Sequence, residues 1–158
     1  MAGKILYKDD IFINLDVEFI SYVGEWPFKI RRFIIPLLKQ ILEISSCDII
    51  PKYIAWDRTD GGFKSRWIAE KDFDRWTKAT IDIWCWGCQN NGIKGWMKAK
   101  IQPFLVTEYY YANSIQKSFW YSYCLLFYDN QRAKYAERGR HLSLEIWKQI
   151  QKKYGMRK

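Results

Sequence analysis

The sequence has very few of the residues from which catalytic and metal sites are usually built. Among 158 residues there is one histidine, His141, and four cysteines. His141 stands directly between Arg140 and Leu142, with no carboxylate or nucleophile beside it, so a surface position is favoured. The acidic residues are scattered or belong to turns such as 57–62. We therefore expect no catalytic residues and a protein that is not an enzyme; an enzyme of an unrecognised type is the least favoured hypothesis.

The four cysteines do not form the pattern of a redox or zinc site. Cys85 and Cys88 have Cys-x-x-Cys spacing, but a redox motif of this kind opens a helix, whereas here a turn follows Cys88. On a regular strand the two thiols would point to opposite faces. Cys47, Cys124 and His141 are too isolated to complete a recognisable zinc pattern. We expect reduced thiols, no metal and no cofactor; metal binding by Cys85 and Cys88 stays open.

Long apolar runs and an N-terminal leader are also missing. The two most apolar stretches, 33–42 and 119–128, are shorter than the roughly 18 residues that a membrane helix requires. No charged-then-apolar segment opens the sequence. The sequence thus predicts no membrane insertion, no visible targeting segment and a location in the cytoplasm, a reducing compartment.

Acidic residues become scarce in the second half of the chain. Residues 1–79 hold 13 Lys and Arg against 12 Asp and Glu, whereas residues 80–158 hold 13 against 5. Residues 130–158 alone hold 9 against 2, within a net charge of +9. The asymmetry suggests a polyanionic partner, either nucleic acid or an acidic protein surface. The alternative is a solvated helix that only keeps the protein in solution.

Hydrophobic periodicity predicts an α+β fold in a single domain, 1–158. Expected strands are Lys4–Tyr7, Ile11–Phe19, Ile49–Trp56, Thr80–Trp86, Ile93–Ile101, Phe104–Tyr111 and Phe119–Tyr128. Expected helices are Phe28–Ile44, kinked or split at Pro36, a short helix within 69–80, and a long basic helix, Gln131–Tyr154, capped by Gly155. We expect a largely antiparallel sheet packed against the buried first helix and the basic C-terminal helix, with Gly139 at a close approach or at a kink.

One strand combines basic and aromatic side chains on one face. Alternation in Ile93–Ile101 places Lys94, Trp96, Lys98 and Lys100 on the same side, whatever the pairing. Three lysines cannot all be buried without partners, so this side faces solvent or a ligand. An indole between lysines can stack on a base beside phosphate contacts.

The hairpin at Asn91-Gly92 decides which residues accompany that face. A two-residue turn pairs Trp86 with Met97 and sends Trp84 and Trp86 to the core. A three-residue loop would place both tryptophans beside Trp96. We favour the two-residue turn.

The C-terminal helix supplies a second basic surface around an apolar stripe. Its candidate contacts with nucleic acid or an acidic partner are Arg132, Arg138, Arg140, Lys148, Lys152 and Lys153. No named nucleic-acid-binding motif can be identified in the sequence.

These observations favour a non-enzymatic interaction module, a small structural subunit of a larger assembly of nucleoprotein, ribosomal or viral type. Nine Trp, eleven Tyr and nine Phe exceed what one core needs, and interfaces favour Trp and Tyr, so other protein subunits are expected partners. The alternative is a small hydrophobic-ligand-binding domain with a cavity between the sheet and the C-terminal helix.

Overall fold

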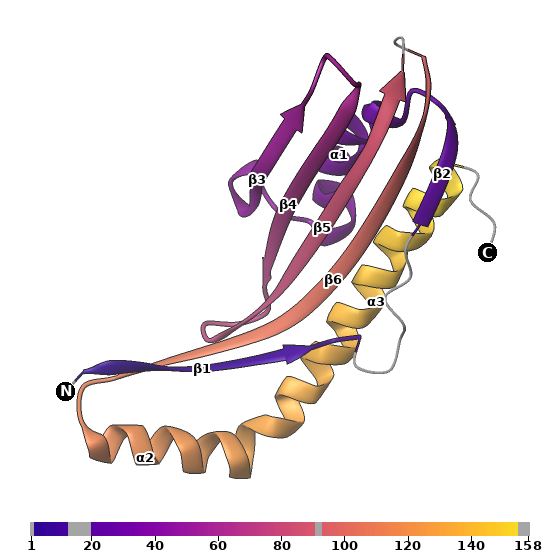
Figure 1. Cartoon of the computed structure of the whole chain (residues 1–158). Helices are drawn as coiled ribbons and strands as arrows, with labels where there is room; N and C mark the ends of the chain where they lie inside the picture. The colour runs from indigo at the N-terminus through magenta and orange to yellow at the C-terminus, as the bar shows by residue number, and fades with distance from the viewer. Residues whose placement is uncertain (1, 13–19, 91–92, 155–158) are drawn as a thin grey trace.

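The structure, a computed structural model, describes residues 2–12, 20–90 and 93–154 and is built around one antiparallel sheet (Figure 1). The strands are β1 (Gly3–Asp10), β2 (Ile20–Glu25), β3 (Ile49–Trp56), β4 (Gly62–Asp72), β5 (Thr77–Asn90) and β6 (Lys94–Tyr111). The helices are α1 (Ile30–Leu42), α2 (Ser114–Tyr123) and α3 (Asp129–Tyr154), with a π-helical turn at Cys124–Tyr128 and 3₁₀ turns at Pro27–Lys29 and Ser46–Asp48. The α+β prediction is confirmed.

The sheet is organised around β6, which is 18 residues long and runs through Pro103 without a break. Its strand order is β1-β6-β5-β4-β3. The edge of β6 opposite β5 is shared, because β2 pairs with residues 94–99 and β1 with residues 104–111. The two separate strands expected at 93–101 and 104–111 are therefore one strand, and β1 pairs with β6 and not with its neighbour in sequence.

Helices α1 and α3 cover one face of the sheet, and no element of the described residues covers the other, which we call the open face (Figure 1). Alternate residues of the strands point to the covered face, as period two requires. They join the apolar sides of α1 and α3 in one core. Its fully buried members include Ile30, Ile34, Leu38, Trp67, Ile81, Ile83, Met97, Ile146 and Ile150.

Several elements lie where the sequence predicted them. Strand β3 has the expected bounds, and α3 begins two residues earlier than expected. Helix α1 continues through Pro36, so the chain is not split there. Gly139 is buried on α3, and an added Cβ would lie 2.8 Å from Cδ1 of Ile11, which confirms the close approach. The predicted cap Gly155 lies outside the described residues.

Two of the predicted elements are wrong. Residues 119–128 are helical, from α2 into the π turn, and not a strand. Residues 69–80 form the end of β4, a tight turn and the start of β5, because the Asp74 carboxylate accepts hydrogen bonds from the backbone of Trp76 and Thr77 and closes that turn. Ile11 and Phe12 lie in a turn, and the rest of the strand expected at 11–19 lies outside the described residues. Within the described ranges, no helix combines the length and apolarity that crossing a membrane requires.

Candidate nucleic-acid interface

The predicted basic strand face lies on the open side of the sheet. Met97, Ala99 and Ile101 of β6 are buried beneath the helices, so the residues between them point away from the core. The indole of Trp96 is 42% exposed, and Lys94 and Lys98 are exposed as well. The structure therefore brings Lys94, Trp96, Lys98 and Lys100 together as one row along β6, with Lys94 at the hairpin end.

The favoured hairpin register is wrong, and the correction enlarges this face. Asn90 pairs with Lys94, so residues 91–93 form a three-residue loop, of which Asn91 and Gly92 lie outside the described residues. Trp86 consequently lies opposite Lys98, and Trp84 opposite Lys100. The inward positions of β5 between and beside these indoles are held by the small residues Cys85 and Gly87, and an added Cβ on Gly87 would lie 3.0 Å from the ring of Phe63.

Strand β4 contributes residues that the sequence analysis missed. Lys64 pairs with Trp86, and Arg66 with Trp84, on the same open face. The alternation of Phe63, Ser65 and Trp67 with these cations could have identified them. A shallow hollow of about 280 Å³ lies here, lined by Tyr53, Lys64, Ser65, Trp84, Cys85 and Trp86. We call the basic face the set Lys64, Arg66, Trp84, Trp86, Lys94, Trp96, Lys98 and Lys100.

Arg66 is fixed at the centre of the basic face. Its Nε donates to Oδ1 of Asp82 at 2.9 Å and to Oδ2 at 3.2 Å, and its Nη2 donates to Oδ2 at 2.6 Å. The guanidinium also lies 4.2 Å from the centre of the Trp84 ring. The hydrogen bond with Asp82 raises the pKa of Arg66. This pair holds the Trp84 indole in place without leaving an unpaired buried charge.

Unlike Arg66, the lysines of the basic face are not held by carboxylates of the described residues. Among the ion pairs of the described residues, none involves Lys64, Lys94, Lys98 or Lys100. One acid is close, since Glu25 of β2 lies opposite Lys94 in the sheet. Asp82 of β5 is bound to Arg66, and Glu70 and Asp72 lie toward the opposite end of β4. Asp57 and Asp60 belong to the turn between β3 and β4, which lies beside Gln89 and Asn90 at the hairpin end. The positive charge of this face therefore comes from lysines without ion-pair partners among the described residues, and acids lie near it at both ends.

The candidate residues on α3 do not join the basic face. Helix α3 packs against the covered side of the sheet, so its exposed residues point away from the open side. Arg138, Arg140, Lys148, Lys152 and Lys153 are all exposed. The sequence therefore gives two basic surfaces on opposite sides of the sheet. His141 is exposed, as predicted, and lies 3.2 Å from Glu137.

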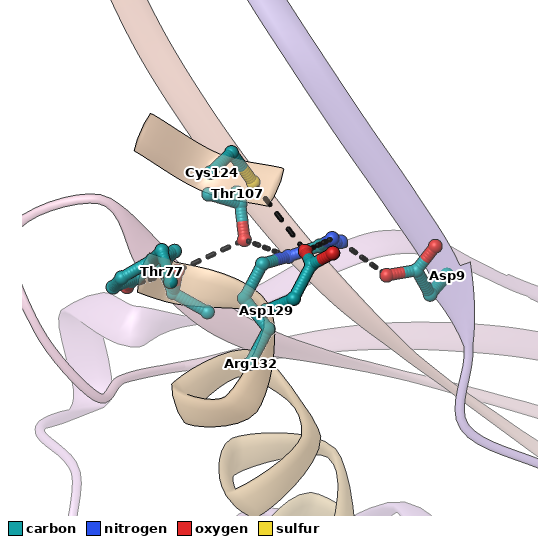
Figure 2. Close-up of polar contacts among 7 residues, drawn as sticks. Asp9, Thr77, Thr107, Cys124, Asp129 and Arg132 are labelled. Carbon is teal, nitrogen blue, oxygen red and sulfur yellow. Dashed lines mark hydrogen bonds and ion pairs between the residues drawn. The ribbon is translucent and has the colours of Figure 1, made fainter. Parts of the chain in front are cut away.

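Arg132 differs from the other cations of α3 because it points inward. Its side chain is only 12% exposed and bonds to Asp9 of β1, to Thr107 of β6 at 3.2 Å and to Asp129 at 3.6 Å (Figure 2). The sequence pattern placed Arg132 on the exposed side of the helix. The carboxylate of Asp9, far away in the sequence, holds it against the sheet instead. Arg132 therefore joins α3 to β1 and β6, and it is not part of an outward-facing surface.

A buried polar chain continues from this arginine into the sheet. The hydroxyl of Thr107 lies 2.9 Å from that of Thr77, which lies 2.8 Å from the hydroxyl of Tyr128, and Tyr128 donates to Asp74. Burial disfavours the charged form of Asp74, but the hydrogen bonds from Tyr128 and from the backbone of the turn outweigh it and lower its pKa. Burial, reinforced by Asp74, raises the pKa of Tyr128. The chain anchors the junction between the π turn and the sheet.

The thiols lie as regular strand geometry requires. Cys85 is buried on the covered face, and burial raises the pKa of its thiol. Cys88 lies on the open face, where its thiol lies 3.1 Å from the carbonyl oxygen of Asp60 and 3.0 Å from Asn90 Oδ1. Within the described ranges, no three histidine, cysteine or acidic residues are grouped as a metal site requires.

Comparison with known proteins does not add a family to this geometry. The chain matches no protein-family model, no curated protein and no solved structure. Its function must be inferred from the chemistry of its surfaces, because a fold alone does not define a function.

Proposed function

We propose that the chain binds single-stranded nucleic acid on the basic face and serves as a non-enzymatic subunit of a nucleoprotein assembly. The observation that carries the proposal is the placement of Trp84, Trp86 and Trp96 among lysines on the face of the sheet that no described element covers. Each base offers a flat ring for stacking, and each phosphate offers a charge to a lysine. A duplex hides the flat sides of its bases, which favours single strands.

The open shape of the hollow supports a polymer over a small molecule. Pockets for small ligands are typically about 300–1,000 Å³ and enclose most of the ligand. The hollow between Tyr53, Lys64 and the two tryptophans has a volume of about 280 Å³, at the lower end of this range, and is open to solvent. It would accept one base of a strand whose phosphates continue across the lysine row.

The first experiment compares two charge reversals of equal size. K98E/K100E changes the basic face, and K148E/K152E changes α3 by the same four charge units. Fluorescence anisotropy with a labelled single-stranded oligonucleotide should give at least about tenfold weaker binding for K98E/K100E and a much smaller loss for K148E/K152E. The logarithm of wild-type affinity should fall with the logarithm of salt concentration by roughly 0.7 per phosphate contacted.

Equal losses in the two variants would contradict a site on the basic face, since they would reflect net charge alone. A wild-type affinity that is insensitive to salt would contradict phosphate contacts altogether. Binding to an acidic polypeptide as tight as to nucleic acid would favour an acidic protein partner instead.

Stacking is tested by W96A in the same assay. Base–aromatic stacking contributes about 1–3 kcal/mol per base, so W96A should weaken single-strand binding by about tenfold. A duplex of the same sequence is the internal control, because it retains the phosphates but hides the flat sides of its bases. A W96A loss that is equal for duplex and single strand would argue against stacking.

The hydrophobic-ligand alternative stays a prediction. The space between the sheet and the two helices is occupied by the cluster of buried side chains described above. Native mass spectrometry of the purified protein would reveal a retained lipid or aromatic compound.

A further inference from the structure

The helical segment 115–127 exposes an unusual amount of apolar surface. Helix α2 runs along the end of the sheet that β1 and β6 form. The chain changes direction between α2 and α3, at the π-helical turn (Figure 1). The exposed fractions are 83% for Ile115, 60% for Phe119, 72% for Leu125, 68% for Leu126 and 71% for Phe127. We call these five residues the apolar face.

The apolar face is continuous and not a scatter of single residues. Ile115, Phe119, Tyr123 and Phe127 are spaced four apart and form one stripe. The rings of Phe119 and Tyr123 are stacked with their centres 6.1 Å apart, and Tyr123 and Phe127 follow at 6.0 Å. Leu126 lies beside this stripe, next to the small residue Ser122. Leu125 lies on the other side of Leu126, four residues after the exposed ring of Tyr121, so the apolar face wraps around the outer side of the segment.

The opposite side of the same segment is already packed. Trp120 stacks on Tyr109 of β6, with ring centres 4.6 Å apart, and its indole N–H donates to the carbonyl of Tyr110. Cys124 and Tyr128 are buried in the same cluster. The fold thus uses one side of the segment and leaves the other without a covering element among the described residues.

We propose that the apolar face is the contact surface with a second copy of this chain. At roughly 200 Å² for a large apolar side chain, its exposed fractions amount to on the order of 700 Å². That exceeds the roughly 300–600 Å² patch typical of a monomer. It approaches the about 800 Å² that each partner contributes to a standard interface. A two-fold axis would bring the same face of each copy together.

The distribution of charge is compatible with this partner. Each copy carries a net charge of +9, which opposes association, yet Lys117 is the one charged residue of segment 115–127, and its Nζ lies toward β6, 5.6 Å from the centre of the Tyr111 ring. Two copies can therefore meet here without opposing like charges or burying an unpaired one. The apolar face lies at the end of the molecule away from the β5–β6 hairpin, so pairing would leave the basic face of each copy accessible (Figure 1).

The test is sedimentation equilibrium of the full chain over a range of concentrations, comparing wild type, L126E and I54E. Leu126 is exposed in one copy, so L126E should fold normally but place an unpaired charge in the pair. The expected result is a wild-type dimer whose dissociation constant rises about tenfold or more in L126E. I54E is the matched control, because Ile54 is 47% exposed on β3, away from the apolar face, and should dimerise like wild type.

Two results would overturn the proposal: a wild-type chain that remains monomeric at about 100 μM, well above micromolar dissociation constants, or an L126E dimer as tight as wild type. Circular dichroism and thermal melting confirm that L126E is folded. Vesicles of mixed anionic and neutral phospholipid are the third arm. A monomer that binds these vesicles through Leu126 would assign the face to a bilayer surface instead. Nucleic-acid binding is measured separately, so either proposal can fail alone.

Discussion

At the scale of single residues, polar side chains hold the helical junction on the sheet. Tyr128 is 5% exposed, and its hydroxyl joins Asp74 in the β4–β5 turn to Thr77 of β5. A buried hydroxyl that satisfies a carboxylate contributes more than an exposed one, because removing it leaves the carboxylate short of a donor.

We therefore expect Y128F to lower the free energy of unfolding by about 1–3 kcal/mol at neutral pH. The control is Y110F, which removes the 3.2 Å bond to Glu108 from a side chain that is 67% exposed and should change little. Chemical denaturation of both variants measures the difference. Equal losses of unfolding free energy in Y128F and Y110F would show that the buried Tyr128 hydroxyl adds no stability and that only the ring of Tyr128 stabilises the fold.

The cost of Y128F should also depend on pH. The pKa of Asp74 lies below its usual value, so its contribution is present above the unfolded pKa of about 3.9 and is lost as the pH falls through the folded value. Wild type should therefore converge toward Y128F as the pH falls below about 4. A difference that stays constant to low pH would exclude a bond to ionised Asp74.

At the scale of elements, the sequence specified faces better than it specified pairings. Side chains alternate along a strand regardless of its neighbours, so the grouping of Lys94, Trp96, Lys98 and Lys100 could be predicted. Pairing depends on the loop length, which Asn-Gly alone does not fix, and a one-residue difference moved Trp84 and Trp86 to the open face.

The helical nature of 119–128 was missed for a physical reason. Periodicity distinguishes helix from strand only where apolar and polar residues alternate, and this run has almost no polar residues. Many of its apolar residues are exposed, so their apolarity does not mark a buried strand. The signal that could have identified the helix is its start. Asn113 Oδ1 accepts from the N–H of Gln116 at 2.8 Å, and Gln116 Oε1 accepts from that of Ala112.

The β5–β6 hairpin depends on glycine where two backbones approach closely. A Cβ on Gly95 would overlap the carbonyl oxygen of Cys88 and lie 2.8 Å from Cα of Gln89. We expect G95A to cost about 1–3 kcal/mol. Its pairing partner Gly24 is the control, since a Cβ there meets only the movable ring end of Tyr22. In urea unfolding, the free energy of unfolding should be clearly lower for G95A than for G24A. The reverse order would contradict the close backbone approach at Gly95.

At the scale of the whole molecule, the cations divide into groups with different roles. Arg66 and Arg132 are bound to carboxylates within the fold. The lysines at the hairpin end of the sheet and the cations of α3 point to opposite sides. The charge asymmetry between the two halves of the chain can be read directly from the sequence. The division of the cations between the two faces of the sheet could not be predicted, because it depends on which face α3 covers.

The two proposals together predict that binding depends on the length of the nucleic acid. Two copies joined through the apolar face present two basic faces, so a strand that reaches both binds with a raised effective concentration. Sheet platforms for single strands occupy about 4–16 nucleotides each. A strand several times longer should therefore bind wild type much more tightly than a short one.

The variant L126E separates this avidity from binding itself. It retains the basic face, so a short strand should bind L126E and wild type equally well. The advantage of the long strand should shrink in L126E to the statistical gain from overlapping sites. Anisotropy titrations with both strands at one salt concentration measure the two ratios. A long-strand advantage that persists in L126E would mean that each copy binds alone, because only a joined pair links two basic faces.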